Sequence, residues 1–260
     1  MPVEEHSDEQ PAAPLSLRGR RRAAATREIL DAAERQIAED GPAALSLRAV
    51  ARSLGMTVQA LYHYFPSRDE LVTALIAKAF DDLAEAVRAA ADAAPDGTPP
   101  ERVVAATEGY RRWAIAHPER FQLLYGTPLR YYAAPAEGPT TRATRRMAAV
   151  FERDLFGEFT EAQLAAARTP DLTPSFLAYL DQLPPTGRRG LPPPATALFM
   201  SAWGHMHGMV VLEVFGHTSF LGEHQAEVFR VAMRNLVEDL RRRIPAAEPG
   251  EGNEGSFPDE

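Results

Sequence analysis

Apolar residues recur three or four positions apart over most of this chain, and no stretch alternates in the way that a half-buried strand requires. The first such stripe, Leu30, Ala33 and Ile37, predicts a helix over residues 23–40. A Gly-Pro pair follows directly and ends that helix, since glycine suits a left-handed cap and proline cannot continue the hydrogen bonding. We therefore expect an all-α protein.

Caps and breakers divide the rest of the chain into further helices. Ser46 and Thr57 can cap two short helices, and the Ser-Arg-Asp-Glu sequence at residues 67–70 is a capping-box pattern that opens a long one. Prolines and glycines separate the remaining stretches, with a short apolar segment at residues 176–180. The predicted helices span residues 23–40, 47–54, 58–64, 67–94, 101–116, 118–125, 141–168, 195–215 and 221–244.

A tight turn at Gly55-Met56 separates the second and third helices. Glycine allows two short helices to cross steeply there, as a helix-turn-helix requires. In that arrangement the second helix lies in the major groove of DNA, and its N-terminal residues face the base edges. These residues are Thr57, Val58, Gln59 and Ala60. Gln59 can bond N6 and N7 of an adenine, and Val58 or Ala60 can contact a thymine methyl group.

The residues that follow are expected to hold the helix on DNA rather than to read its sequence. Leu61 and Phe65 are four positions apart and should turn inward. Polar side chains around them can donate hydrogen bonds to phosphates, as can the first turn of the long helix. The residues expected to contact the DNA backbone are Ser46, Arg48, Tyr62, His63, Tyr64 and Arg68.

An arginine-rich segment precedes the first predicted helix. Its Arg20, Arg21 and Arg22, together with Arg18, can enter a minor groove or contact phosphates. Two simpler interpretations stay open. The arginines can form only a solvated tail, and the aromatic residues of the third helix can merely pack a small helical core.

A strong resemblance to the DNA-binding domain of TetR-family transcriptional regulators covers residues 24–72, AATREILDAAERQIAEDGPAALSLRAVARSLGMTVQALYHYFPSRDELV. It rests on the segments ILDAAERQIAEDG, LSLRAVARSLGMT and LYHYFPSRDEL. Tyr64 and Arg68 depart from the histidine and lysine that many members carry, but both keep a hydrogen-bond donor. The resemblance implies a homodimer that places one such domain on each DNA half-site.

A second likeness lies near the end of the chain, in AWGHMHGMVVLEVFGH at residues 202–217. Its Trp203, His207 and Gly208 resemble the Trp-x-x-x-His-Gly signature of a C-terminal domain that recurs in the same family. The segment HPERFQLLYG, residues 117–126, is similar to the same subgroup.

Trp203 and His207 are four positions apart and should share one face of their helix. We expect them to line a cavity for an apolar, flat effector, together with aromatic and methionine side chains from other helices. The alternative is that the same residues only fill the core. The expected lining is Tyr110, Trp113, Phe121, Tyr125, Phe151, Phe199, Trp203 and His207.

The last two helices, near residues 195–215 and 221–244, each carry an apolar stripe and are expected to form the dimer. The stripes are Leu198, Phe199, Ala202, Met206 and Val210 in the first helix, and Val228, Phe229, Ala232, Leu236 and Leu240 in the second. The family resemblance implies that these helices form a four-helix bundle with their two-fold copies. Such a dimer should read a near-palindrome with half-sites roughly 34 Å, or a multiple of it, apart.

The net charge of -8 comes from the two ends of the chain. Residues 1–17 hold four acids and residues 245–260 hold five, with no basic residue in either, so the chain between them carries +1. Both ends are rich in Pro, Gly and Ala, which predicts disorder. Between them we expect a DNA-binding domain at 18–66, the head, and a ligand-binding and dimerisation domain at 67–244, the body, whose helix 67–94 connects the two.

Several function classes are excluded by what the sequence lacks. Cysteine is absent, which removes disulfides and thiol chemistry. No apolar run reaches the roughly 18 residues of a membrane span, and the first residues lack the apolar segment of a signal peptide, so we expect a cytoplasmic protein. His205 and His207 point to different sides of their helix, so we expect no metal site, and no nucleophile motif indicates an enzyme.

Together these observations predict a ligand-responsive, dimeric DNA-binding transcriptional regulator without a cofactor. The simplest form is a repressor that leaves a palindromic operator when a small apolar or aromatic molecule enters the body. Two alternatives stay open: a regulator that binds DNA without any ligand, and a small-molecule binding protein or enzyme that has lost DNA binding.

Overall fold

The computed structural model describes residues 16–94, 97–126, 132, 137–182 and 190–246. Over these residues the regular structure is helical and contains no strand, as predicted. The predicted disordered ends lie outside the described residues except at their inner edges. At the first of these edges, Ser16 and Leu17 already belong to the cap and start of a helix.

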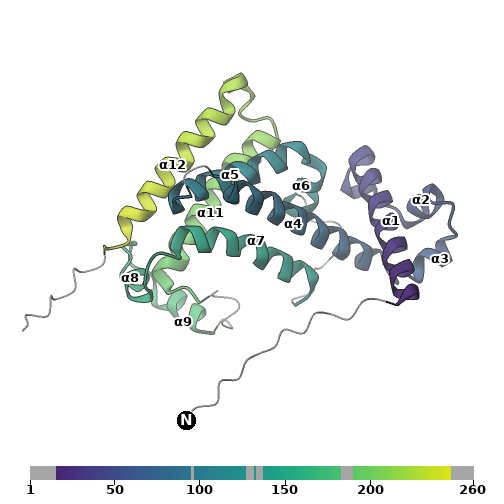
Figure 1. Ribbon diagram of the computed structural model, residues 1–260, viewed down its shortest axis with the longest axis horizontal. Helices are drawn as coiled ribbons and strands as arrows, with labels where there is room; N and C mark the ends of the chain where they lie inside the picture. The colour runs from purple at the N-terminus through teal and green to yellow at the C-terminus, as the bar shows by residue number, and fades with distance from the viewer. Residues whose placement is uncertain (1–15, 95–96, 127–131, 133–136, 183–189, 247–260) are drawn as a thin grey trace, which may run out of the picture.

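Three helices and a 3-10 turn form the head (Figure 1). They are α1 (Leu17–Asp40), η1 (Pro42–Ala44), α2 (Leu47–Ser53) and α3 (Val58–Tyr62). The start of α1 differs from the prediction: it begins at Leu17 rather than at residue 23, because Ser16 caps it by accepting a hydrogen bond from Gly19 N at 3.1 Å. The predicted arginine arm is therefore helical, and its residues lie on the first turns of α1.

The apolar stripe of α1 faces the core of the head. Ala33 and Ile37 are completely buried, as predicted. Leu30 is only half-buried, and Ile29 occupies the inner position instead. The next helix, α4 (Arg68–Asp92), begins in the head and continues through the body, with its first turn capped by Ser67.

The body wraps further helices around α4, which packs most extensively against α5 and α7 (Figure 1). α6 contacts α4 and α5, and it also contacts α1 and η1 of the head, so it lies at the junction of the two domains. The body helices are α5 (Pro99–Ala116), α6 (Pro118–Tyr125), α7 (Pro139–Phe156), α8 (Glu161–Ala165), α9 (Pro174–Gln182), α11 (Pro193–Val214), η2 (Ser219–His224) and α12 (Gln225–Arg243).

The helix predicted over residues 141–168 is interrupted, so that prediction was wrong in its second half. α7 ends at Phe156 and α8 starts after Thr160 with a capping box. The Thr160 hydroxyl accepts from Gln163 N at 3.2 Å, and the Gln163 side-chain oxygen accepts from Thr160 N at 2.9 Å. Buried apolar residues continue across the break, which is why their spacing alone predicted one helix.

The last helix also starts later than predicted. Residues Ser219–His224 form the 3-10 segment η2, and α12 begins only at Gln225. Gly222 interrupts the helical conformation there with φ +56°, a left-handed value that glycine adopts without a steric penalty.

The apolar stripes predicted for the dimer mostly face the core of the protomer itself. All five predicted residues of α11 are buried, as are Phe229 and Leu240 of α12. A second set of apolar side chains points outward from the same two helices and their connection. It comprises Met200, Leu212, Phe215, Phe220, Val228 and Val231. α11 is thus apolar on both of its faces, a pattern typical of a helix that is buried from two sides.

Candidate DNA-binding surface and effector pocket

The amino end of α3 is exposed at the turn after α2. Gly55, at φ +65°, makes this turn, and the Thr57 hydroxyl caps α3 by accepting from Ala60 N at 3.1 Å. Thr57 and Gln59 are exposed, whereas Val58 and Ala60 are half-buried and Val58 packs against the head core. Of the four predicted base-reading residues, Thr57 and Gln59 are therefore the two whose side chains are exposed to solvent and can extend toward DNA.

The carboxyl end of α3 is tied to α1 by Arg22. Its Nη2 donates to the His63 carbonyl oxygen at 3.0 Å, and its guanidinium carbon lies 5.3 Å from the centre of the Tyr64 ring. Tyr64 is half-buried against the core, while Tyr62 and His63 are exposed. Arg22 and Tyr64 therefore position α3, and Tyr62 and His63 remain available at the surface.

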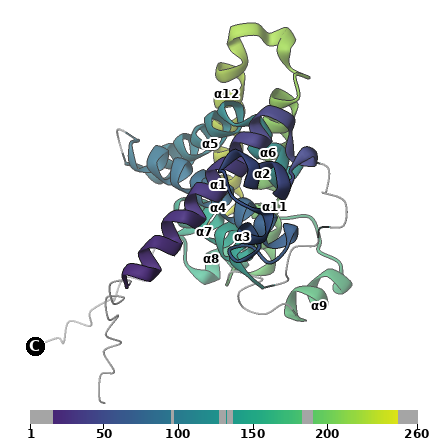
Figure 2. The same cartoon turned by 90° about the vertical axis from the view of Figure 1, so that its right-hand side faces the viewer.

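The other predicted DNA contacts also include both exposed side chains and side chains that are bonded within the protein. Arg20, Arg21 and Arg48 are exposed, and the start of α1 extends clear of the rest of the molecule (Figure 2). Arg68 is half-buried, and its Nε donates to the Leu45 carbonyl oxygen at 3.3 Å, which holds the start of α4 on the loop before α2.

Ser46 precedes α2 but makes no side-chain cap bond. Gln36 of α1 orders this loop instead, because its side-chain oxygen accepts from Ser46 N at 3.2 Å and its Nε2 donates to the Ala44 carbonyl oxygen at 3.1 Å. Sequence reasoning missed Gln36, since an exposed-looking glutamine within a helix gives no signal for a bond to the next loop.

One pocket of the body brings together several of the predicted ligand-binding residues. This outer pocket lies between α6, α7 and α11 and has a volume of about 210 Å³. Met200 is 54% exposed, so the pocket opens to the surface on that side. Its walls are Tyr125, Thr144, Met147, Ala148, Phe151, Leu191, Thr196, Phe199, Met200 and Trp203.

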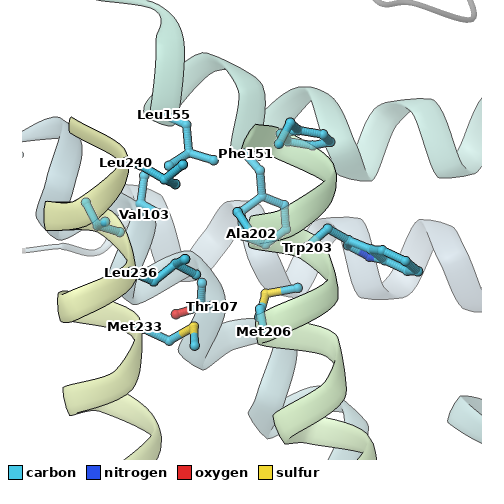
Figure 3. Close-up of a pocket in the computed structure, with 12 residues that line it drawn as sticks. Val103, Thr107, Phe151, Leu155, Ala202, Trp203, Met206, Met233, Leu236 and Leu240 are labelled. Atoms are coloured by element: carbon cyan, nitrogen blue, oxygen red, sulfur yellow. The ribbon is translucent and has the colours of Figure 1, made fainter. Parts of the chain in front are cut away.

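A smaller cavity of about 30 Å³, the inner cavity, adjoins the outer pocket (Figure 3). The two share Phe151, Phe199 and Trp203 as walls. Apart from Thr107, whose hydroxyl donates to the Val104 carbonyl oxygen at 2.7 Å, the lining is apolar. A cavity with such walls and no free hydrogen-bonding partner offers little to a water molecule.

Other predicted ligand-binding residues form an aromatic cluster beside the outer pocket rather than its wall. The His207 ring stacks on Trp203 with centroids 4.9 Å apart, and it lies 4.4 Å from the Tyr125 ring. The Tyr110 hydroxyl is 2.8 Å from His207 Nδ1, and the buried ring of Phe121 packs against Tyr110 with centroids 6.3 Å apart.

Burial sets the charge state of this cluster. It lowers the pKa of His207, so the imidazole stays neutral under conditions in which a free histidine begins to protonate. Burial also raises the pKa of Tyr110 strongly and that of Tyr125 to about 12. The cluster is therefore uncharged near neutral pH.

Trp113 lies apart from the pocket, near the junction of head and body. Its ring is 5.4 Å from that of His117, and the guanidinium carbon of Arg120 lies 5.9 Å from it. The pKa of His117 is lowered by burial and by the positive charge of Arg120.

A charged cluster joins the head to the body at this point. Arg120 of α6 donates through Nη2 to Glu34 of α1 at 2.5 Å and to Asp82 of α4 at 2.6 Å. Lys78 of α4 donates to both oxygens of Glu34 at 2.9 Å and to Asp82 at 3.3 Å. We call these four residues the junction cluster. Partial burial lowers the pKa of Lys78, but its bond to Glu34 and the two acidic charges raise it overall.

The junction cluster could not be read from the sequence. Its members come from three helices, and their pairing depends on how those helices cross. The one available signal was that Lys78 is the only lysine among many arginines, which looks like codon bias when taken alone.

Two kinds of site are absent from the part of the chain that the structure describes. It contains no group of three or more His, Cys, Asp or Glu side chains placed to hold a metal ion. Likewise, none of the described helices is both long enough and apolar enough to cross a membrane.

Two protein-family profiles match the chain. Residues 29–75 match the profile of bacterial regulatory proteins of the tetR family, and residues 103–236 match a tetracyclin repressor-like C-terminal domain. The chain is 36% identical over 190 residues to an HTH-type transcriptional regulator of Mycobacterium tuberculosis, Rv1816, covering 73% of this chain and 80% of that protein. The BetI regulator of Rhizobium meliloti is 30% identical over 131 residues, covering 49% of this chain and 58% of BetI.

Solved structures share the whole fold. The regulatory protein SCO4313 superposes with a TM-score of 0.66 and 32% identity, covering 86% of this chain and 100% of that one. A tetR-family regulator from Streptomyces coelicolor gives a TM-score of 0.51 at 17% identity, covering 87% and 92% of the two chains. At that lower identity the likeness concerns the fold alone.

Proposed function

Because the chain belongs to the TetR family of bacterial transcriptional regulators, we propose that it is a dimeric repressor released from a palindromic operator by a small apolar molecule. As a regulator of bacterial genes it would act in the cytoplasm, where the DNA is. The observation that carries the proposal is the exposed amino end of α3, with Thr57 and Gln59 outward on a head that is otherwise well packed.

On DNA, Gln59 would read a base, and the surrounding hydrogen-bond donors would contact the DNA backbone. A glutamine amide matches the N6 and N7 edge of adenine in the major groove. Tyr62 and His63 at the other end of α3, and Arg20 and Arg21 on α1, are exposed and can reach phosphates. Arg22 and Arg68 would act indirectly, since their donors already hold α3 and α4 in place.

Dimerisation is supported by the two apolar faces of α11. One face packs inside the protomer, and the other exposes Met200, Leu212 and Phe215, which a second copy can cover. Val228 and Val231 extend the same kind of surface along α12. Exposed apolar side chains gathered on two neighbouring helices are typical of an interaction site.

Ligand response would pass through α6. This helix carries Tyr125 in the wall of the outer pocket and, about one and a half turns earlier, Arg120 in the junction cluster. A ligand that displaces Tyr125 would shift α6 and so pull on Glu34 of the head. For release, the ligand must bind more tightly to the form whose heads no longer match the groove spacing.

The experiment that tests this function is selection of bound sequences from a random pool of duplex DNA with the purified protein. We expect a near-palindrome to emerge. Gln59→Ala should then cost roughly 1–3 kcal/mol on the selected site and relax the preference at one base position of each half-site.

The matched control is Gln182→Ala, which removes the same side chain from an exposed position of α9. It should bind the selected site as the native protein does. Failure to enrich any sequence at low salt, or equal effects of the two substitutions, would overturn the proposed role of α3.

A further inference from the structure

The described residues that line the outer pocket include no charged side chain. Its lining is made of aliphatic, aromatic and methionine side chains, with two threonine hydroxyls, one tyrosine hydroxyl and the indole N–H of Trp203 as polar groups. An ionised ligand group placed deep in it would lose hydration without gaining a counter-charge from these walls, which is unfavourable. The pocket therefore favours an uncharged ligand.

The two threonines have little to give to a ligand. The Thr144 hydroxyl donates to the Thr140 carbonyl oxygen at 3.0 Å. The Thr196 hydroxyl lies 3.1 Å from the Pro192 carbonyl oxygen, one turn earlier in α11. Each hydroxyl proton is thus engaged by the backbone. Among the described lining residues this leaves the Tyr125 hydroxyl and the Trp203 indole N–H as donors, and Tyr125 is the only one of the two that is a hydroxyl.

The Tyr125 hydroxyl has a poor acceptor for its proton. It points to the sulfur of Met147 at 4.0 Å, and a thioether is a weak acceptor. On its other side the Tyr125 ring lies 6.5 Å, centroid to centroid, from the ring of Tyr110. The Tyr110 hydroxyl is itself 2.8 Å from His207 Nδ1, so it already has a partner.

The Tyr125 hydroxyl can therefore exchange its weak contact to Met147 for a better acceptor on a ligand. Its surroundings stay uncharged near neutral pH, because burial raises the pKa values of both tyrosines and lowers the pKa of His207.

We propose that the effector is an uncharged, largely apolar molecule with one hydrogen-bond acceptor, such as a carbonyl oxygen, and that this acceptor takes the proton of Tyr125. The proposal rests on the effector role given to the pocket under the proposed function. The inner cavity, behind Phe151, Phe199 and Trp203, gives an apolar end of the ligand room to extend. Met206 and Met233 line that cavity and can adapt to different shapes.

The test uses two small probes of similar size, acetophenone and benzoate, measured by isothermal titration calorimetry on the full chain. We expect acetophenone to bind at least about tenfold more tightly than benzoate. Tyr125→Phe should weaken acetophenone binding by about tenfold, the loss of one good hydrogen bond. Tyr179→Phe removes the same hydroxyl from an exposed tyrosine of α9 and should change nothing.

A second variant checks the location of the probe. Ala148→Leu adds a side chain into the outer pocket and should abolish acetophenone binding while circular dichroism shows an intact helical fold. Absence of acetophenone binding to the native chain would overturn the proposal. So would benzoate binding as tightly as acetophenone, or unchanged binding in Tyr125→Phe.

The outcomes separate this proposal from the proposed function. If acetophenone binds through Tyr125 but leaves operator affinity unchanged, the pocket chemistry holds and ligand-driven release is refuted. If the protein binds DNA as expected but acetophenone does not bind through Tyr125, the DNA-binding function is retained and the proposed ligand class is refuted.

Discussion

The junction cluster makes a specific prediction for Glu34→Gln. The substitution keeps the shape of the side chain but removes the charge that two cations share, Lys78 at 2.9 Å and Arg120 at 2.5 Å. The side chains of Glu34 and Arg120 are each 18% exposed, so solvent screens the interaction between their charges only in part. A hydrogen bond to a charged group is worth about 1.5–3 kcal/mol, and we take about 2–3 kcal/mol for the loss after that screening.

For a chain of this size about 1 kcal/mol corresponds to about 2–4 °C, so the melting temperature should fall by roughly 4–12 °C. The free energy of unfolding is measured by urea unfolding, with the helical circular dichroism signal at about 222 nm as the readout. Thermal melting curves give the melting temperature. The same variant should also weaken the effect of any ligand on DNA binding, because Glu34 is where α6 holds the head.

The matched control is Glu85→Gln in α4. Glu85 bonds Arg88 of the same helix at 2.6 Å, but both side chains are largely exposed, at 64% and 50%. A surface pair of this kind contributes little, so no measurable change is expected. Equal effects of Glu34→Gln and Glu85→Gln would refute the reasoning that the junction cluster fastens the head to the body.

Three further predictions concern other parts of the molecule. Because burial lowers the pKa of His207, its contribution to the free energy of unfolding should be constant above about pH 6.5 and should fall as the pH decreases below it, and His207→Asn should reduce that fall in acid titrations followed by circular dichroism. Arg22→Ala should lower thermal stability by roughly 0.5–1.5 kcal/mol, whereas Arg21→Ala should leave stability unchanged and flatten the salt dependence of DNA binding. Val231→Glu should dissociate the dimer in analytical ultracentrifugation, while Leu177→Glu on α9 should not; a monomeric native protein would contradict this.

Much of the fold followed from local signals. The caps at Thr57 and Ser67 and the turn at Gly55 appear where the sequence places them, because each depends on neighbouring residues only. The break after Phe156 was missed although the sequence Thr-Glu-Ala-Gln at residues 160–163 already carried a capping box. There the continuing apolar spacing outweighed the cap, and a reading that gave the cap more weight would have found α8.

The start of α1 was missed for a different reason. Its first turns carry arginines rather than an apolar stripe, because they have no core to face, and periodicity therefore gave no signal. Arginine nevertheless has a high helix propensity, and Ser16 supplied a cap. An amphipathic pattern finds the buried part of a helix and not its solvent-exposed extension.

The candidate site shows where sequence reasoning stops. Trp203 and His207 were correctly placed on one helix face, yet only Trp203 is in the wall of the outer pocket. Whether a buried aromatic faces a cavity or another ring depends on the distances between α6, α7 and α11, which no local pattern specifies. The same limit applies to the two faces of α11, where the predicted stripe turned out to pack within the protomer.

A practical consequence follows from the position of Lys78. It carries the only side-chain amine in the sequence, so amine-directed reagents have one internal target besides the chain's amino terminus. Its nitrogen is held by two carboxylates and its side chain is 31% exposed, so acylation should be slow while α1, α4 and α6 stay together. The acylation rate of Lys78, followed by mass spectrometry of the labelled peptide, would then report how often the head and the body separate, without any engineered probe.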